Sequence, residues 1–238
     1  AVDASTRSRD TAHLMSCAQP SANVHARLIT WSIHQLTGAS IQEWEVEAAI
    51  RWLKAGTAPG EDGVTPDMVV AAGQPMRRVL MGLFNKCWKV GSLPSRWGKA
   101  RVRMLHKRDS KHECTNYRGI SLLDVMSKLY EKVLDHRMQA LQAVVAPGKG
   151  VQPEQLGFSP NHRVEDAVHG LVEGVKHNRN DGNRVVILLS ADVKKAYPSM
   201  PRGKMLEAVA DMGVTGQLYL AIAATYDGNE SVVLTSDT

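Results

Sequence analysis

One aspartate near the C-terminal end of the chain stands where an acidic side chain could do chemistry. Asp192 follows an apolar run, and the residues from Val185 to Leu189 are continuously apolar and rich in β-branched side chains. Such a run predicts a strand buried on both faces of a sheet, with Asp192 delivered to its end. An acid in that place typically binds a metal ion or stabilises a cation, although it can also simply terminate a buried strand.

A second chemical signal is the basic stretch between Arg96 and Arg118. It holds eight lysines or arginines against two acidic residues, a net charge of +6, whereas the whole chain carries +5. The rest of the chain is therefore about neutral. A concentrated basic stretch indicates an anionic partner, with nucleic acid or nucleotide phosphate as the obvious class. A solvated basic face without a ligand is the alternative.

The basic stretch has the alternation of a half-exposed strand. From Ala100 to Lys107, the pattern A-R-V-R-M-L-H-K alternates apolar with basic residues and puts Arg101 and Arg103 on one face. The segment N-Y-R-G-I-S-L-L at 116–123 follows a polar turn and predicts the returning strand of a hairpin. Such a hairpin would present cations over a cleft, so Arg101 and Arg103 are expected to bind nucleic acid.

Helical periodicity covers most of the remaining chain. Residues 1 to about 40 lack sustained periodicity, although Leu28 to Leu36 could make a short helix. A further strand is expected from Ser231. Together these patterns predict an α/β (α+β) fold. Helices are expected at 41–55, 74–90, 125–145, 163–178, about 202–212 and about 215–226.

Composition narrows the classes of protein. With 238 residues, 43% of them hydrophobic, the chain can form a sizeable core. Three widely spaced cysteines without a C-x-x-C pair signal neither a disulfide framework nor a zinc cluster. A reducing, intracellular compartment fits best, with the nucleus as one candidate. No apolar run approaches the roughly 18 to 20 residues of a membrane span, so no membrane partner is expected.

Seven short motifs follow one another along the chain. They are A-P-G-E-D-G-V at 58–64, L-F-N at 83–85, A-R-V-R-M-L-H-K at 100–107, N-Y-R-G-I-S-L-L at 116–123, K-L-Y-E-K-V-L at 128–134, Q-L-G-F at 155–158 and A-D-V-K-K-A-Y at 191–197. Taken in this order, they resemble the reverse transcriptase domain of non-LTR (LINE-like) retrotransposons. The resemblance covers roughly residues 45 to 215.

The resemblance implies a right-hand polymerase of which this chain holds the fingers and the beginning of the palm. Residues 1–44 would form a partly irregular N-terminal extension, residues 45–180 a fingers-like region, and residues 181–238 the start of the palm. The implied activity is that of an RNA-directed DNA polymerase. Such an enzyme adds dNTPs to the 3′-hydroxyl of a DNA primer on an RNA template, by phosphoryl transfer with two Mg²⁺ ions.

The resemblance also assigns roles to particular residues. Asp192 matches the first metal-binding aspartate of the palm, and the backbone carbonyl of Val193 would help to hold the same Mg²⁺. Tyr197 matches the position whose ring lies under the nucleotide sugar and excludes a 2′-hydroxyl. Lys107 and Arg118 match the finger positions that bring cations to the incoming triphosphate.

The chain also departs from the family pattern. Gly119 stands where most relatives have proline, and Pro198 where most have aspartate. The later palm motif, an aromatic followed by x-Asp-Asp, is not found, and neither is a glutamine-glycine motif. Since one carboxylate cannot hold two metal ions in reacting geometry, the chain is expected to be truncated before that motif and catalytically incomplete. The alternatives are a dead element remnant that at most binds nucleic acid, and a pseudogene product with no function.

Overall fold

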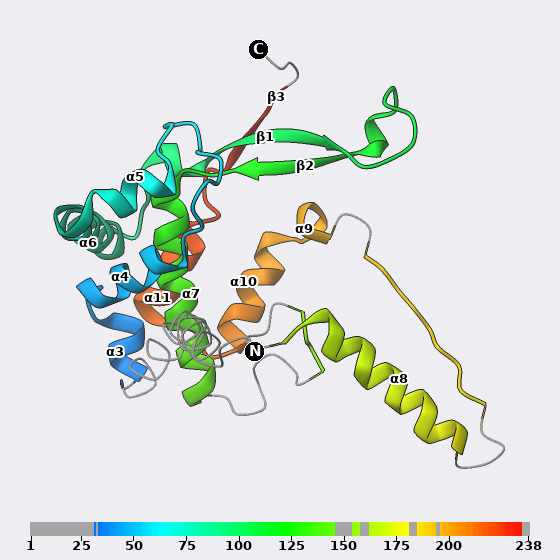
Figure 1. The fold of residues 1–238 in the computed structure, drawn as a ribbon. Helices are drawn as coiled ribbons and strands as arrows, with labels where there is room; N and C mark the ends of the chain where they lie inside the picture. Colours follow the sequence, from blue (N-terminus) through cyan, green and yellow to red (C-terminus); the bar gives the residue numbers. More distant parts are fainter. Residues whose placement is uncertain are drawn as a thin grey trace, which may run out of the picture.

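Helices dominate the computed structural model, which describes residues 31, 33–145, 154–157, 162–180, 185–193 and 196–234 (Figure 1). Each of the six long helices lies within three residues of the bounds expected from the sequence, and the α/β (α+β) fold class is confirmed. The elements are α3 (Ile33–Gly38), α4 (Glu43–Trp52), α5 (Pro66–Ala71), α6 (Gly73–Val90), η1 (Ser95–Gly98), β1 (Lys99–His106), η2 (Cys114–Asn116), β2 (Tyr117–Leu122), α7 (Val125–Val145), α8 (Val164–Asn180), α9 (Ala196–Ser199), α10 (Arg202–Asp211), α11 (Gly216–Ala224) and β3 (Glu230–Leu234).

A small sheet with the strand order β2-β1-β3 lies at one end of the helices. The strands β1 and β2 are antiparallel and form the predicted hairpin. The strand β3 begins one residue before the predicted Ser231 and pairs with β1 in parallel. The expected fingers-like region and the expected start of the palm therefore share one sheet. The division of the chain into three regions stays a prediction.

The core lies where α4, α6, α7 and α11 meet. Apolar residues at helical spacing on α6 and α7, among them Leu80, Phe84, Leu129 and Val133, are fully buried. Burial of one such side chain stabilises the fold by roughly 1.5 to 3 kcal/mol relative to exposure. The core packing therefore comes largely from the periodic stripes that the sequence displays.

Asn85 of the L-F-N motif connects α6 to the segment that precedes α4. Its side-chain Oδ1 accepts a hydrogen bond from the Ile41 backbone N–H at 2.7 Å, and its Nδ2 donates to the Ile41 carbonyl at 2.8 Å. This reciprocal pair satisfies both backbone groups of a buried residue. The L-F-N motif therefore has a structural role, because Phe84 is buried in the core and Asn85 holds the chain beside it.

An aromatic cluster in the core contains one buried hydroxyl without a partner among the described residues. Tyr130 is fully buried between Phe84 and Trp97, with ring centroids 5.4 and 5.8 Å away. Burial raises the pKa of this hydroxyl above its ordinary value. A buried polar group without a hydrogen bond costs roughly 1 to 3 kcal/mol.

Substitution of Tyr130 by phenylalanine should therefore not destabilise the protein. The ring contacts remain and the unpaired hydroxyl is removed, so we expect the free energy of unfolding in urea to stay equal or to rise by about 1 kcal/mol. The variant Tyr130→Leu serves as the comparison, because it removes the ring and should destabilise. A loss of more than about 1 kcal/mol in Tyr130→Phe would show that the hydroxyl has a partner.

The prediction of a strand at 185–189 is wrong. Residues 185–193 form a run outside any helix or strand, and Val185 and Leu189 are 87% and 93% exposed. A strand exists through ladder hydrogen bonds to its neighbours, and the described strands β1, β2 and β3 pair only with one another. Of the short helix expected within 28–36, the structure describes Trp31 and α3 from Ile33 on. Residues 1–30, and Phe158 of Q-L-G-F, lie outside the described residues.

Candidate nucleotide and nucleic-acid interface

The hairpin of β1 and β2 gathers three arginines on one of its faces. Residues directly opposite in an antiparallel pair point to the same side of the sheet, and alternate residues of one strand do so too. Arg101, Arg103 and Arg118 therefore share a face, and all three side chains are exposed. The cross-strand pairs that establish this are Arg101–Leu122, Arg103–Ile120 and Leu105–Arg118.

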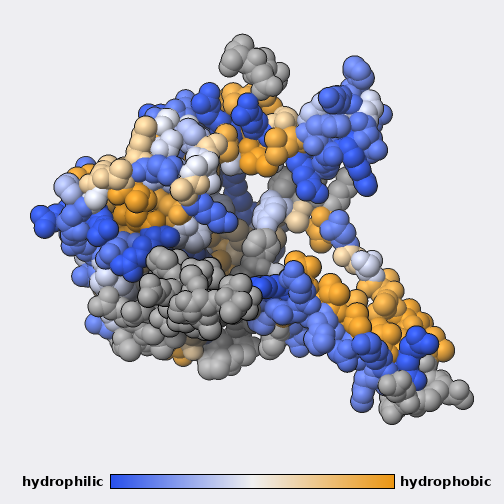
Figure 2. Space-filling view, in the orientation of Figure 1, coloured by the Kyte–Doolittle hydropathy of each residue, from blue (hydrophilic) through white to orange (hydrophobic). Residues whose placement is uncertain are grey.

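Lys107 extends the same row at the far end of the hairpin. It lies two positions beyond Leu105, its side chain is exposed, and its backbone N–H donates to the Asn116 carbonyl at 2.8 Å. On the opposite face, the rings of His106 and Tyr117 lie 5.2 Å apart and brace this end. Figure 2 shows that hydrophilic residues cover the outer half of the hairpin.

Gly119, one of the departures from the family pattern, lies on the face opposite the arginines. A Cβ at this position would be 2.9 Å from Cγ1 of Val102 on the neighbouring strand. That distance is shorter than carbon atoms tolerate, so the glycine makes room for the branched Val102 side chain. The departure is therefore matched by packing within the hairpin.

Asp192 and Val193 lie outside the hairpin that carries the cations. Both residues are exposed in the run 185–193, and among the described residues Asp192 makes no hydrogen bond or ion pair. Carboxylate and carbonyl oxygens are the ligand types that Mg²⁺ prefers. However, the part of the chain that the structure describes contains no group of three or more His, Cys, Asp or Glu that could hold a metal ion. The donor atoms of Asp192 and Val193 suit two of the oxygen ligands of a magnesium site, but they do not complete its coordination.

Tyr197 lies in the short helix α9 and borders a cavity of about 830 Å³ between α7, α10, α11 and the sheet. Tyr197 is 79% exposed. Glu131 and Tyr226 line the same cavity. Burial raises the pKa of Glu131 even though Ser127 donates a hydrogen bond to its carboxylate, and burial together with the Glu131 charge raises the pKa of Tyr226. The cavity therefore combines mostly apolar walls with a carboxyl group whose pKa is raised by burial.

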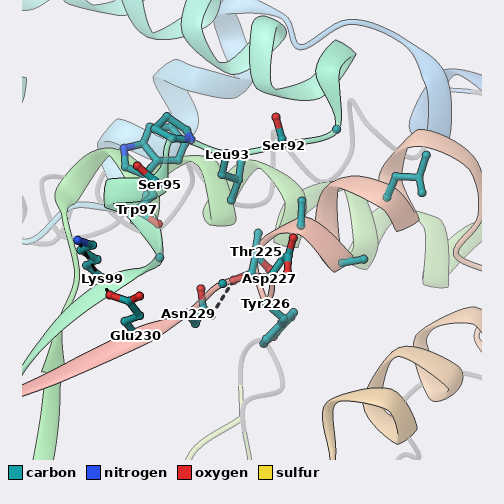
Figure 3. A pocket seen from close by; sticks show the side chains of 18 of the residues that line it. Ser92, Leu93, Ser95, Trp97, Lys99, Thr225, Tyr226, Asp227, Asn229 and Glu230 are labelled. Carbon is teal, nitrogen blue, oxygen red and sulfur yellow. Dashed lines mark hydrogen bonds and ion pairs between the residues drawn. The ribbon is translucent and has the colours of Figure 1, made fainter.

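A neighbouring cavity of about 820 Å³ lies between η1 and the turn from α11 into β3 (Figure 3). Lys99 and Glu230 form an ion pair of 4.0 Å across the paired strand ends. Arg202 lines both cavities, and its Nη1 donates to the Tyr226 carbonyl at 2.9 Å. This bond ties the start of α10, five residues after Tyr197, to the α11–β3 turn.

Several of these residues were missed by the sequence reasoning. Glu131 and Arg202 reach their cavities only through the packing of separate helices, so no local pattern marks them. Asp124 is buried beside Gly60 and Arg96. Its place directly before a predicted helix is a typical helix-start signal, which could have identified it as a residue that bonds to backbone.

Comparison with known proteins agrees with the motifs. Residues 105–236 match the family described as reverse transcriptase (RNA-dependent DNA polymerase). The chain is 28% identical over 180 residues to the putative 115 kDa protein in type-1 retrotransposable element R1DM of Drosophila melanogaster. These residues make up 73% of this chain and 16% of that protein. It is 30% identical over 134 residues to the probable RNA-directed DNA polymerase from transposon BS of the same species, covering 55% of this chain and 14% of that protein.

A third relative is the retrovirus-related Pol polyprotein from type-1 retrotransposable element R2 of Popillia japonica. It is 22% identical over 172 residues, which make up 71% of this chain and 22% of that protein. The chain thus spans about a fifth or less of the length of these relatives. In the described residues, every helix is too short or too polar to cross a membrane. The matched region includes Lys107, Arg118, Asp192 and Tyr197, and the chain belongs to the reverse transcriptase (RNA-dependent DNA polymerase) family.

Proposed function

We propose that this chain is the fingers and the start of the palm of an RNA-directed DNA polymerase encoded by a non-LTR retrotransposon. Its full-length parent would extend the 3′-hydroxyl of a DNA primer with dNTPs on an RNA template. The parent would act inside the cell, with the nucleus as one candidate compartment. The family match and the order of the motifs support this proposal.

The observation that carries the proposal is the common face of Arg101, Arg103 and Arg118 on the hairpin. A row of exposed cations on a protruding hairpin suits a phosphate backbone, and guanidinium groups can bind phosphate oxygens through two hydrogen bonds. In the complete polymerase, Lys107 and Arg118 would contact the triphosphate of the incoming nucleotide. Arg101 and Arg103, nearer the base of the hairpin, would contact nucleic acid.

We further propose roles for the residues of the A-D-V-K-K-A-Y motif. The Asp192 carboxylate and the Val193 carbonyl would supply oxygen ligands to one of two Mg²⁺ ions, which when bound neutralise charge on the reacting phosphate. The Tyr197 ring would lie under the nucleotide sugar and exclude a 2′-hydroxyl. The exposed position of all three residues leaves them accessible to a nucleotide.

The alternative function is a remnant that binds nucleic acid without catalysis. It is favoured by the fact that, within the described ranges, Asp192 belongs to no group of three or more His, Cys, Asp or Glu that could hold a metal ion. Both functions require the hairpin face to bind nucleic acid. They differ in whether the full-length parent incorporates dNTPs.

Neutralising the hairpin face should weaken RNA binding by this chain. In the triple variant Arg101→Gln, Arg103→Gln, Arg118→Gln, we expect the slope of log affinity against log salt to fall by about 2, since each lost phosphate contact on a single strand removes about 0.7. Fluorescence anisotropy of a short labelled RNA, titrated at several salt concentrations, measures both affinity and slope.

The matched control removes the same charge elsewhere. In Arg51→Gln, Arg77→Gln, Arg78→Gln, three arginines of α4 and α6 are neutralised, and we expect the slope to stay as in the unchanged chain. Equal losses in the two triple variants would mean that net charge alone attracts the RNA and that the hairpin face is not the binding surface.

A further inference from the structure

Asp124 joins three segments of the chain at the base of the hairpin. It lies between the end of β2 and the start of α7, and its side chain is only 2% exposed. Its Oδ1 accepts a hydrogen bond from the backbone N–H of Asp62 at 3.3 Å. Its Oδ2 lies 3.3 Å from Nε of Arg96, which belongs to η1 directly before β1. The carboxylate therefore connects the 58–64 loop with the segment before β1 and the segment after β2.

Gly60 fixes the loop against this carboxylate. A Cβ at Gly60 would lie 2.3 Å from Oδ1 of Asp124 and 2.6 Å from its backbone nitrogen, distances that no side chain can occupy. The glycine in A-P-G-E-D-G therefore permits the loop to close over Asp124. From this buried position, Oδ2 of Asp124 forms the ion pair with Nε of Arg96.

The outer part of Arg96 remains available to a ligand. The side chain is 53% exposed, and within the described residues its one polar contact is the pair between Nε and Asp124. The Nη1 and Nη2 atoms are the two donors of the guanidinium fork that can bind a phosphate through two hydrogen bonds. Arg96 precedes β1 in the chain, so it lies at the base of the hairpin that carries Arg101 and Arg103.

The ion pair between Asp124 and Arg96 contributes little to stability. Removing a carboxylate from water is costly unless a good partner compensates, and an arginine that is half exposed compensates weakly because water screens the pair. What the buried carboxylate does provide is a fixed orientation for an exposed guanidinium. A cation that is already oriented loses less entropy when it binds its ligand.

We propose that Arg96 is a phosphate-binding residue, preoriented by Asp124, that extends the nucleic-acid surface of the hairpin to its base. This inference rests on the nucleic-acid binding stated under Proposed function. The phosphate belongs either to the nucleic-acid backbone or to a nucleotide triphosphate. We commit to the backbone, because Arg96 lies at the end of the hairpin away from Lys107.

The test compares two arginines with equal exposure. Arg96 and Arg51 are both 53% exposed and both pair with one carboxylate. In anisotropy titrations of a labelled RNA with the full chain, we expect Arg96→Gln to weaken binding and to lower the salt slope by about 0.7, and Arg51→Gln to change neither. Titration of a fluorescent dNTP is the second arm. Weaker binding of the dNTP, with RNA binding unchanged, would assign the phosphate to the nucleotide and not to the backbone. Unchanged binding of both ligands overturns the proposal.

The variant Asp124→Asn separates preorientation from simple charge. It removes one negative charge, so general electrostatic attraction would strengthen RNA binding. If Asp124 orients Arg96, binding instead weakens, and the double variant Asp124→Asn, Arg96→Gln binds no more weakly than Arg96→Gln alone, because both changes remove one interaction. Binding that is unchanged or tighter in Asp124→Asn overturns the role of Asp124.

Two further controls distinguish failure of this inference from misfolding of a variant and from failure of the proposed function. Urea unfolding identifies variants that fail to fold. If Asp124→Asn is among them, Arg96→Lys replaces it, since lysine keeps the charge but lacks both Nε and the fork. Wild-type affinity in Arg96→Lys would then overturn the proposal, and a weakened affinity supports it. An unchanged chain that does not bind RNA would remove the proposed function itself, whereas normal binding by the chain and by Arg96→Gln removes only this inference.

Discussion

Substitution of Asp192 by alanine should abolish Mg²⁺-dependent primer extension by the full-length parent. If the Asp192 carboxylate holds a metal ion at the reacting phosphate, its removal forfeits several kcal/mol of transition-state stabilisation, a rate loss of about 10³-fold or more. Incorporation of labelled dNTP onto an RNA-templated primer measures the effect. The change should leave folding intact, because Asp192 is exposed and unpaired among the described residues, and surface changes of this kind shift stability by about 0.5 kcal/mol or less.

The control for this experiment is Asp211→Ala, which removes an exposed aspartate from the last position of α10. That variant should extend primers at the rate of the unchanged parent. Extension that survives in Asp192→Ala would exclude Asp192 as a metal ligand. A parent that extends no primer at all would favour the remnant that binds nucleic acid without catalysis.

Substitution of Arg137 by methionine should be among the most destabilising single changes in the chain. Arg137 is fully buried on α7, and its Nε and Nη2 donate to the Glu45 carboxylate at 2.6 and 2.8 Å. Its Nη1 and Nη2 also donate to the carbonyls of Ala39 and Ser40, respectively. The guanidinium also lies 4.7 Å from the ring centroid of Trp88. The charge of Arg137 is thus paired, and four of its five guanidinium N–H groups have partners inside the core.

Loss of one partner of a buried ion pair typically costs about 3 to 5 kcal/mol, because the other charge is left unpaired. We expect Arg137→Met to lower the free energy of unfolding in urea by that amount. The double variant Arg137→Met, Glu45→Gln should lose less, since no charge remains buried alone. The exposed pair of Arg51 and Glu47 is the control, and Arg51→Met should cost no more than about 1 kcal/mol. A small loss in Arg137→Met would mean that water reaches Glu45.

The elements that the sequence predicted correctly are those whose signal is local. The stripe on α6 repeats at helical spacing and ends at Gly91, which adopts the left-handed φ of 70° that favours glycine. The alternation from Ala100 to Lys107 predicted β1 and the common face of Arg101 and Arg103, which the register confirms. Periodicity reports which face of an element is buried, so elements with a clear period need no tertiary information.

The prediction of a strand before Asp192 was wrong because its signal is not a local, periodic one. Continuous apolar runs carry no period, and a run such as 185–189 becomes a strand only when neighbouring strands supply its hydrogen bonds. The apolar surface that remains on this run and on α8 is visible in Figure 2. The roles of Asp192, Val193 and Tyr197 therefore rest on the family motif and stay predictions until the activity measurements are made.

By itself, the sequence determined the helices, the hairpin, the concentration of positive charge and, through the order of its motifs, the family. Each of these depends on residues close together along the chain. The tertiary structure alone decided that Arg118 shares a face with Arg101 and Arg103, that β3 pairs in parallel with β1, and that Asp124 reaches Arg96 and the loop at Gly60. These contacts join segments far apart in sequence, and packing fixes which residues meet because a close-packed interior allows few alternative arrangements.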